Sequence, residues 1–412
     1  MYFRDIAGMN HISHSLLSCL ALGATPDDLQ ARYQDEGVNQ RPMPPIDAEL
    51  LEKMYCDVEV LYANLCVKPL YQTFLRLFER LIEERGWKAV VQEHLFSRTK
   101  IAERMLASMF DGLYHPFIHL GLGVEFQLPG LVAEALAQAA SNDDSHLPKL
   151  FGACETAAAT TGAVAVPARQ KSLLDLMHEV RANDRIRNAP QWSDLGLKLK
   201  NGLVGRACDD FAQVAGQFTI EKTEEALARR TAEMISTVAF VSGAAQQKGR
   251  KTKIDFFVMH SVTSSIFASV MGQQCDWISL EDRIRLMEWK ARTDLAWYAV
   301  AGSPELDGSY VSEYGGQASQ NSGEWSDIFM AVVKEHDDGH AAKFIRALKN
   351  GELVGRQYEK DSTWAGYFPM KGDMWLKLAN MCQDTTTNRP INTKWVMFTG
   401  FPEAWTRPDL AS

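Results

Sequence analysis

Six of the ten histidines in this 412-residue chain lie in four short, mostly apolar stretches that are far apart in the sequence. The stretches read Asn10-His11-Ile12-Ser13-His14, His115-Pro116-Phe117-Ile118-His119, Phe256-Phe257-Val258-Met259-His260 and Asp337-Asp338-Gly339-His340-Ala341-Ala342-Lys343. Histidines recur at a spacing of three or four residues in two of them, and such pairs share one face of a helix. Imidazole is costly to bury without a partner. The pattern therefore predicts helices that present imidazole to a common interior, as bundle proteins do when they hold a metal.

Helical periodicity dominates the rest of the chain, and few segments alternate with a period of two residues. We therefore expect an all-α fold with a minor sheet or none. The expected helices span residues 11–22, 47–94 with breaks near Pro69 and Gly86, 100–114, 128–140, 172–183, 221–245, 254–270, 280–301, 326–349 and 371–382. Residues 303–323 are rich in Gly, Ser and Pro and predict a long loop. If the histidine stretches converge from both ends of the chain, residues 1–412 form a single domain, which is the expected organisation.

Charge and composition exclude several classes of partner. The net charge of −9 and the lack of a basic run argue against a nucleic-acid binder and against attraction to anionic membranes. No apolar run is long enough to cross a membrane, and the first residues lack the pattern of a secretory signal. The seven cysteines are scattered without a CxxC pair, which favours a reduced, cytoplasmic protein. No sequence feature predicts an oligomeric state.

Familiar cofactor and nucleophile motifs are absent. The chain has no GxGxxG after a strand and no GxxxxGK[ST], so neither a Rossmann dinucleotide site nor a P-loop is predicted. It also lacks a GxSxG elbow and an HExxH pair. A flavin or nicotinamide enzyme of familiar type is therefore disfavoured.

Each histidine stretch also allows an ordinary interpretation when it is taken alone. His115 and His119 fit a helix that starts near Pro116, where proline is tolerated in the first turn. Asn10 is a plausible helix cap before His11 and His14. A lone histidine such as His260 at the end of an apolar run is more often a hydrogen-bonded core residue than a ligand. The four remaining histidines stand among polar neighbours and are expected at the surface: His94, His146, His178 and His336.

The stretch around His340 and Lys343 is the most unusual of the four. Asp337 and Asp338 precede a helix turn, where negative charge suits the positive end of the helix. In the ordinary interpretation, Lys343 is a solvated lysine that pairs with an acid such as Asp338. The alternative starts from the fact that an ammonium cannot bind a metal, whereas a lysine carbamate, formed with carbon dioxide, offers a carboxylate-like oxygen. Burial lowers the pKa of a lysine and so favours the neutral amine that forms a carbamate.

The order and spacing of these motifs resemble the questin oxidase-like family of fungal aromatic-polyketide pathways. The matching segments are Asn10-His11-x-x-His14 with Ala21-Leu22-Gly23-Ala24, His115-Pro116-Phe117-Ile118-His119-Leu120-Gly121-x-Gly123-x-Glu125-Phe126, Glu134-Ala135-Leu136-Ala137, Asp255-Phe256-Phe257-x-Met259-His260 with Thr263-Ser264-Ser265, Asp337-Asp338-x-His340-x-x-Lys343 with Arg346-Ala347-Leu348, and Trp375-Leu376-Lys377. They cover nearly the whole chain.

The resemblance implies oxidative ring opening of an anthraquinone or related aromatic polyketide, with a Baeyer–Villiger-like outcome. It further implies, for part of the family, a non-haem iron, Fe(II), that reacts with O2 and is held by four histidines and a carboxylated lysine. Carried over to this sequence, the ligands fall among the six clustered histidines, which is two more than four ligands require. The assignment taken here gives His115, His119, His260, His340 and Lys343 as metal ligands. His11 and His14 are left as catalytic acid–base groups.

Two other interpretations of the same residues remain open. In the first, the protein is a metal-independent monooxygenase in which NADPH supplies electrons and the histidines transfer protons. In the second, it is a catalytically silent helical scaffold that binds a polyketide. The metal content of the protein distinguishes the metal-independent monooxygenase from an iron enzyme. Oxygen uptake distinguishes the silent scaffold from an oxygenase.

Overall fold

A computed structural model describes residues 9–38, 40–142, 146–162, 170–316 and 324–411 of the chain. Within these residues the structure is helical, with two isolated β-bridges and no sheet, so the all-α prediction is confirmed. None of its helices is both long and apolar enough to span a bilayer.

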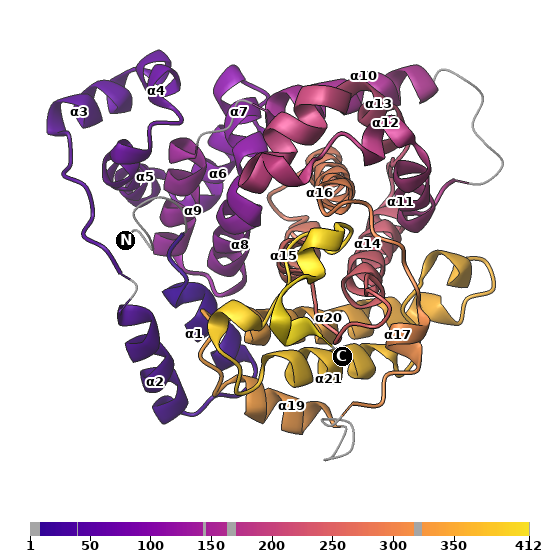
Figure 1. Ribbon diagram of the computed structural model, residues 1–412. Helices are drawn as coiled ribbons and strands as arrows, with labels where there is room; N and C mark the ends of the chain where they lie inside the picture. Colours follow the sequence, from indigo (N-terminus) through magenta and orange to yellow (C-terminus); the bar gives the residue numbers. More distant parts are fainter. Residues whose placement is uncertain (1–8, 39, 143–145, 163–169, 317–323, 412) are drawn as a thin grey trace.

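The first part of the chain forms helices α1 to α9, drawn in indigo and purple in Figure 1. Their bounds are α1 (Ile12–Ala21), α2 (Pro26–Gly37), α3 (Ala48–Cys56), α4 (Val58–Asn64), α5 (Tyr71–Arg85), α6 (Trp87–Val91), α7 (Lys100–Ser108), α8 (Asp111–Glu125) and α9 (Pro129–Ser141). A single turn at Lys68–Leu70 and Gly86, which has φ +78°, interrupt the helical run where the sequence predicts breaks.

The remainder of the chain adds helices of very different length. They are α10 (Leu147–Gly162), α11 (Leu173–Ala182), α12 (Asp184–Arg187), α13 (Gly205–Ala215), α14 (Glu224–Ala244), α15 (Phe256–Gly272), α16 (Leu280–Val300), α17 (Ser309–Ser312), α19 (Trp325–Val332), α20 (His340–Glu359) and α21 (Met374–Thr386). The segment after α21 consists of short 3₁₀ turns and irregular chain. The predicted 303–323 loop contains α17, and residues 317–323 of it lie outside the described part of the chain.

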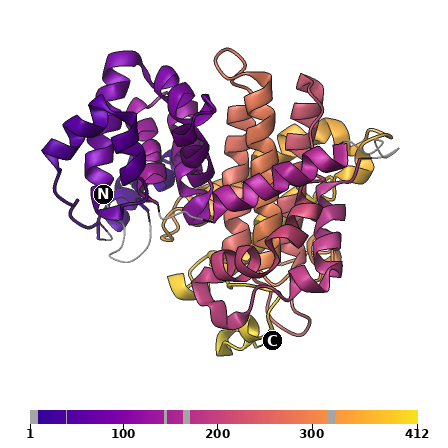
Figure 2. The ribbon, with the colours of Figure 1, turned by 90° about the horizontal axis from the view of Figure 1, so that it is seen from above.

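Helix α15 is the centre of the packing. It contacts α8, α14, α16 and α20, and its residues from Val258 to Ser269 are buried on every side, as expected of a helix without a polar face. Figure 2 shows the indigo and purple helices gathered on one side of the long orange helices. Close approach of α8 to α15 depends on Gly121, where a Cβ atom would lie 2.3 Å from the ring of Phe267.

Helix α1 packs against both α8 and α20, so the two ends of the chain meet beside α15. The contact between α1 and α20 depends on Gly339, which has φ +71° and would place a Cβ atom 2.6 Å from the Cα of Ser15. Glycine adopts this left-handed conformation at no steric cost. The fold therefore brings the four histidine-bearing helices α1, α8, α15 and α20 together.

Besides an unpredicted break at Asp57 within residues 47–94, between α3 and α4, two predicted helices are wrong in their extent. Residues 326–349 do not form one helix: α19 ends at Val332, and left-handed Asp338 and Gly339 precede a new helix at His340. Residues 100–114 also break, because α7 ends at Ser108 and a left-handed turn precedes His115. In both cases the periodicity of apolar residues continues across a turn that changes the direction of the chain.

Candidate metal centre

The six clustered histidines are all buried and lie together, although up to 329 positions separate them in the numbering from His11 to His340. Four of their rings form a closed circuit with centroid separations of 4.7 Å (His11–His115), 5.3 Å (His115–His260), 5.3 Å (His260–His340) and 5.1 Å (His340–His11). With metal–nitrogen bonds of about 2.1 Å, imidazole rings around one ion have centres roughly 4.5–5.3 Å apart. The centroid separations of this four-histidine ring lie in that range, while the group of ligand atoms that all lie within 4.8 Å of one another in the described residues is that of His11, His14 and His115.

The members of the four-histidine ring are held in the same way. The Nδ1 atom donates a hydrogen bond to a backbone carbonyl in His11 (to Met9, 2.7 Å), His115 (to Gly112, 2.5 Å), His260 (to Phe256, 2.7 Å) and His340 (to Asp337, 2.7 Å). A carbonyl only accepts, so each Nδ1 bears the proton and each Nε2 of the neutral imidazole presents a lone pair. Histidines that bind metals are oriented by this kind of second hydrogen bond.

Among the described residues, the Nε2 atoms of His260 and His340 lack the proton donors that a purely structural role would require. The Nε2 atoms of His11 and His115 face each other at 2.9 Å, and those of His260 and His340 have no hydrogen-bond partner in the described structure. Two lone pairs at 2.9 Å repel unless a cation lies beside both of them. Nitrogens bound at right angles to one ion at about 2.1 Å lie about 3.0 Å apart, so the observed distance fits a metal.

Burial opposes the alternative in which these rings are protonated. It lowers the pKa of His260 to about 3, with the positive charge of Lys343 acting in the same direction. The pKa values of His11, His115 and His340 are also held well below the ordinary value, first by burial and then by neighbouring positive charge. The imidazoles are therefore neutral at physiological pH and able to act as ligands.

Lys343, on α20, lies close enough to the four-histidine ring for its charge to act on His260 and His340. It is 3% exposed, and its Nζ atom has no hydrogen-bond partner among the residues that the structure describes. The ordinary interpretation, in which it is solvated or hydrogen-bonded to Asp338, is therefore not what the structure contains. Burial lowers its pKa to about 8, against the opposing negative charges of Asp337, Asp338 and Glu36. A buried amine with a lowered pKa is suited to carbamate formation.

His14 and His119 form a separate pair beside the four-histidine ring. The Nε2 atom of His14 lies 2.6 Å from Nδ1 of His119, and Nε2 of His119 lies 3.3 Å from a carboxylate oxygen of Glu134. Burial alone would raise the pKa of Glu134, but hydrogen bonding to His119 and its charge hold that pKa below its usual value. Both nitrogens of His119 thus have neighbours in the protein. The ligand atoms of His14, His11 and His115 all lie within 4.8 Å of one another, close enough to hold one metal ion, and Nδ1 of His14 has no hydrogen-bond partner among the described residues.

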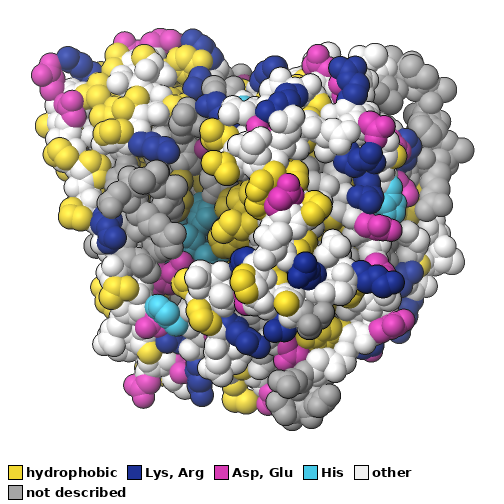
Figure 3. Space-filling view, in the orientation of Figure 1, with side chains coloured by type: hydrophobic (Ala, Val, Ile, Leu, Met, Phe, Trp, Pro, Cys, Tyr) yellow, Lys and Arg dark blue, Asp and Glu magenta, His cyan; other side chains and the backbone are white. Residues whose placement is uncertain are grey.

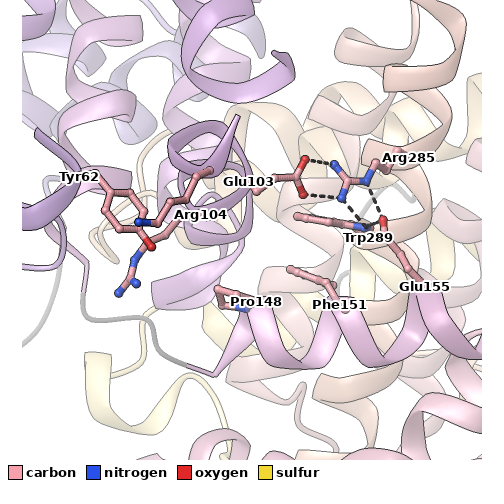
Figure 4. A pocket seen from close by; sticks show the side chains of 10 residues that line it. Tyr62, Glu103, Arg104, Pro148, Phe151, Glu155, Arg285 and Trp289 are labelled. Atoms are coloured by element: carbon pink, nitrogen blue, oxygen red, sulfur yellow. Dashed lines mark hydrogen bonds and ion pairs between the residues drawn. The ribbon is translucent and has the colours of Figure 1, made fainter. Parts of the chain in front are cut away.

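The open pocket between α4, α7, α10 and α16 is a different feature (Figure 4). It has a volume of about 220 Å³, and Arg285 crosses it with ion pairs of 2.6 Å to both Glu103 and Glu155. Trp289 donates a further hydrogen bond of 2.8 Å to Glu155. These polar groups satisfy one another, and none of the six clustered histidines lines the pocket.

Comparison with known proteins shows the family of the chain. The sequence matches the profile of the family described as Questin oxidase-like over residues 9–348, which includes all six histidines and Lys343. The chain belongs to the questin oxidase-like family. It is 58% identical to a Baeyer-Villiger monooxygenase of Cryptosporiopsis sp., over the whole chain and 91% of that relative. It is 56% identical to a Baeyer-Villiger oxidase of Paecilomyces divaricatus, over the whole chain and 88% of that relative. Identity to a questin oxidase of Aspergillus fumigatus is 42%, over 98% of the chain and 89% of that relative.

The structure of this questin oxidase-like protein corrects one expectation about the remaining histidines. His178 and His336 are exposed and His146 is partly buried, but His94 is only 4% exposed. Its Nδ1 atom donates to the carbonyl of Val90 at 3.0 Å, and its ring packs edge-on against Phe78. His94 lies on the hidden side of a helical segment whose polar neighbours face solvent, which local composition does not reveal.

Sequence reasoning missed two groups that hold the candidate ligands in this family member. Glu134, on α9, lies beside His119, and only the helical Glu134-Ala135-Leu136-Ala137 motif pointed to that segment. Tyr114 directly precedes His115 but hydrogen-bonds to α16, which no pattern in the sequence indicates. Such contacts depend on which helices become neighbours in the fold.

Proposed function

We propose that this protein is an oxygenase that opens the ring of an anthraquinone or a related aromatic polyketide, with a non-haem ferrous iron held by histidines and a carboxylated Lys343. The observation on which the proposal rests is the buried four-histidine ring, on all members of which the charge of Lys343 acts, while the amine of Lys343 has no hydrogen-bond partner among the described residues. The names of the relatives, Baeyer-Villiger monooxygenase and questin oxidase, support the reaction class.

The donor set suits iron chemistry. Imidazole is a good ligand for iron, and one anionic oxygen ligand supports its higher oxidation states. Ferrous iron would supply the one-electron chemistry that lets triplet dioxygen react with a closed-shell aromatic molecule. A carbamate on Lys343 would provide the negative charge that four neutral imidazoles lack.

We propose a ligand set in which His11, His115, His260 and His340 join Lys343. The sequence-based assignment of His119 as a ligand stays a prediction, and the contacts of both its nitrogens favour exchanging it with His11. We keep the predicted acid–base role for His14. His119, which contacts His14, and Glu134, which contacts His119, would accept or return its proton.

A flat aromatic substrate has a suitable surface beside the ring. Phe256 packs against His260 and His340 with centroid separations of 4.8 and 5.4 Å. Phe257, the next residue, stacks on Phe398 at 4.3 Å. In Figure 3, histidine atoms are visible in a hollow at the centre left of the molecule, with hydrophobic side chains beside them. We propose that this aromatic wall receives the polyketide.

The central experiment measures iron, oxygen and product on the same protein preparation. We expect iron bound near one equivalent, and oxygen uptake with an anthraquinone that needs no NADPH and stops after chelation. The product is a ring-opened, benzophenone-type acid. Full activity of the metal-free protein with NADPH would show that it is a metal-independent monooxygenase instead. If no anthraquinone caused oxygen uptake, the interpretation as a polyketide-binding scaffold would stand.

The ligand set predicts that His260→Ala loses bound iron and at least about 100-fold of the activity, because a ligand contributes more than the outer groups that change affinity by 10–100-fold. The matched control is His94→Ala, which also removes a buried imidazole whose Nδ1 donates to a carbonyl one turn earlier. Metal analysis and circular dichroism of both variants check the prediction. Equal iron content in the two variants would reject the assignment.

The aromatic wall predicts a different effect for Phe256→Ala. We expect KM for an anthraquinone to rise about 10-fold or more while the iron content stays at the wild-type level, because burial of an aromatic face is lost without loss of a ligand. Steady-state kinetics with metal analysis separates the two quantities. An unchanged KM would place the substrate elsewhere.

A further inference from the structure

The three residues before His115 form a left-handed turn. Gly112, Leu113 and Tyr114 have φ values of +55°, +59° and +63°. Glycine tolerates this conformation, but it is unfavourable for leucine and tyrosine, and runs of it are rare because the side chain crowds the backbone. Unfavourable backbone persists only where surrounding contacts enforce it, and such places cluster at functional sites.

The turn has a direct consequence for His115. The carbonyl of Gly112, which the turn directs at the imidazole, accepts the hydrogen bond from Nδ1 of His115. That bond sets which nitrogen of His115 bears the proton and leaves Nε2 facing His11 at 2.9 Å. The left-handed turn therefore determines both the tautomer and the direction of one member of the four-histidine ring.

Tyr114 anchors the turn to helix α16. Its hydroxyl donates to Oδ1 of Asp294 at 2.7 Å, and the ring is completely buried. Lys290, one turn earlier on α16, holds the same carboxylate with contacts of 2.6 and 2.7 Å. Both charged side chains are 0% exposed, so this ion pair lies in the interior of the protein.

The same lysine also contacts the backbone of α15 next to His260. Nζ of Lys290 donates to the backbone carbonyl of Ser261 at 3.1 Å, and Ser261 directly follows His260. One buried ion pair thus contacts the backbone next to His260 and, through Tyr114, the turn next to His115. A buried ion pair is a weak source of stability, because desolvation offsets much of its attraction, so its presence calls for another explanation.

We propose that Tyr114, Asp294 and Lys290 are positioning residues of the metal centre, which lock the left-handed turn and fix the geometry of His115 relative to His260. The inference rests on the proposed function in so far as a metal is the group being positioned. It adds residues that touch no ligand atom themselves. Tyr114 is the most informative member, because its hydroxyl can be removed without separating Lys290 from Asp294.

The test is Tyr114→Phe, which keeps the buried ring and removes only the hydroxyl. The matched control is Tyr298→Phe on α16, where an equally buried tyrosine donates to the carbonyl of Pro304 at 2.8 Å away from the histidines. Affinity for Fe(II), measured anaerobically against a competing chelator, is expected to fall about 10–100-fold in Tyr114→Phe and to stay at the wild-type level in Tyr298→Phe. Thermal melting of both variants reports any loss of stability that they share.

A second readout does not depend on a metal. In ¹⁵N-histidine NMR of the metal-free protein, the Nδ1-protonated tautomer of His115 is expected in wild type and in Tyr298→Phe, and a mixture of tautomers in Tyr114→Phe. Wild-type affinity and an unchanged tautomer in Tyr114→Phe would overturn the inference. Wild-type protein without any affinity for Fe(II) would overturn the proposed function instead, and the tautomer measurement would still decide whether Tyr114 positions His115.

Discussion

Lys343→Ala is expected to abolish iron binding and to lower activity by more than about 100-fold, while the protein stays folded. The variant removes the group that supplies the anionic oxygen of the proposed ligand set, once it has become a carbamate. It also removes a buried amine that has no hydrogen-bond partner among the described residues, so the fold loses no polar contact of that amine. Iron analysis, oxygen uptake and circular dichroism measure the three outcomes.

Lys377→Ala is the matched control for this prediction. Lys377 is also a helical lysine, but its Nζ atom forms an ion pair of 2.9 Å with Asp373 and donates to the carbonyl of Ser312 at 2.6 Å. It is expected to retain iron and activity. Added acetate or formate is expected to restore part of the activity of Lys343→Ala by replacing the missing oxygen ligand. Wild-type activity in Lys343→Ala would end the carbamate proposal.

The metal-free protein is expected to lose stability steeply as the pH falls below about 6.5. Burial holds the pKa values of five clustered histidines (His11, His14, His115, His260 and His340) below the ordinary value, to about 3 in His260. The unfolded chain therefore binds protons below pH 6.5 that the folded chain does not bind, and stability is lost as the pH falls from 6.5 towards the folded-state pKa values. His260, whose folded-state pKa is about 3, contributes up to about 1.4 kcal/mol per pH unit below pH 6.5, and the lowered pKa values of the other four histidines act in the same direction.

Urea unfolding of the metal-free protein at several pH values between 7.5 and 4.5 measures this dependence. Replacement of one buried member, in His260→Leu, is expected to reduce the slope by about 1.4 kcal/mol per pH unit. Removal of an exposed imidazole, in His178→Ala, is expected to leave the slope unchanged. If the free energy of unfolding varies little across this pH range, burial does not keep the clustered histidines neutral in the metal-free protein.

Much of the helical architecture could be predicted from periodicity and end signals. The α9 helix begins at Pro129 and α11 is capped by Ser172, both at the predicted positions, because proline and serine favour a helix start for local reasons. The ion pair of Lys377 with Asp373 follows equally from a spacing of four residues. These features depend only on near neighbours in the chain.

The features that the sequence did not predict depend on contacts between residues far apart in the chain. The break before His340 and the turn before His115 are left-handed, and packing against α1 in one case and α16 in the other holds them. His94 is buried because of the direction in which its helix turns, not because of its sequence neighbours. Periodicity reports which residues prefer the interior but not where tertiary contacts bend the chain.

The candidate centre shows the same division between local features, which the sequence predicts, and tertiary contacts, which it does not. The sequence by itself indicated that the six histidines and Lys343 lie in mostly apolar stretches, several at helical spacings, because apolar surroundings and periods of three and four residues are local properties. It left open whether they are ligands or ordinary helix residues. Only the tertiary structure decided which of them form a ring, because the direction of each imidazole depends on backbone carbonyls at Met9, Gly112, Phe256 and Asp337. It also decided that His119 faces His14 and Glu134, and that the amine of Lys343 has no hydrogen-bond partner among the described residues. Residues far apart in the chain exchange hydrogen bonds only after the helices have packed, so the identity of the ligands is a property of the fold.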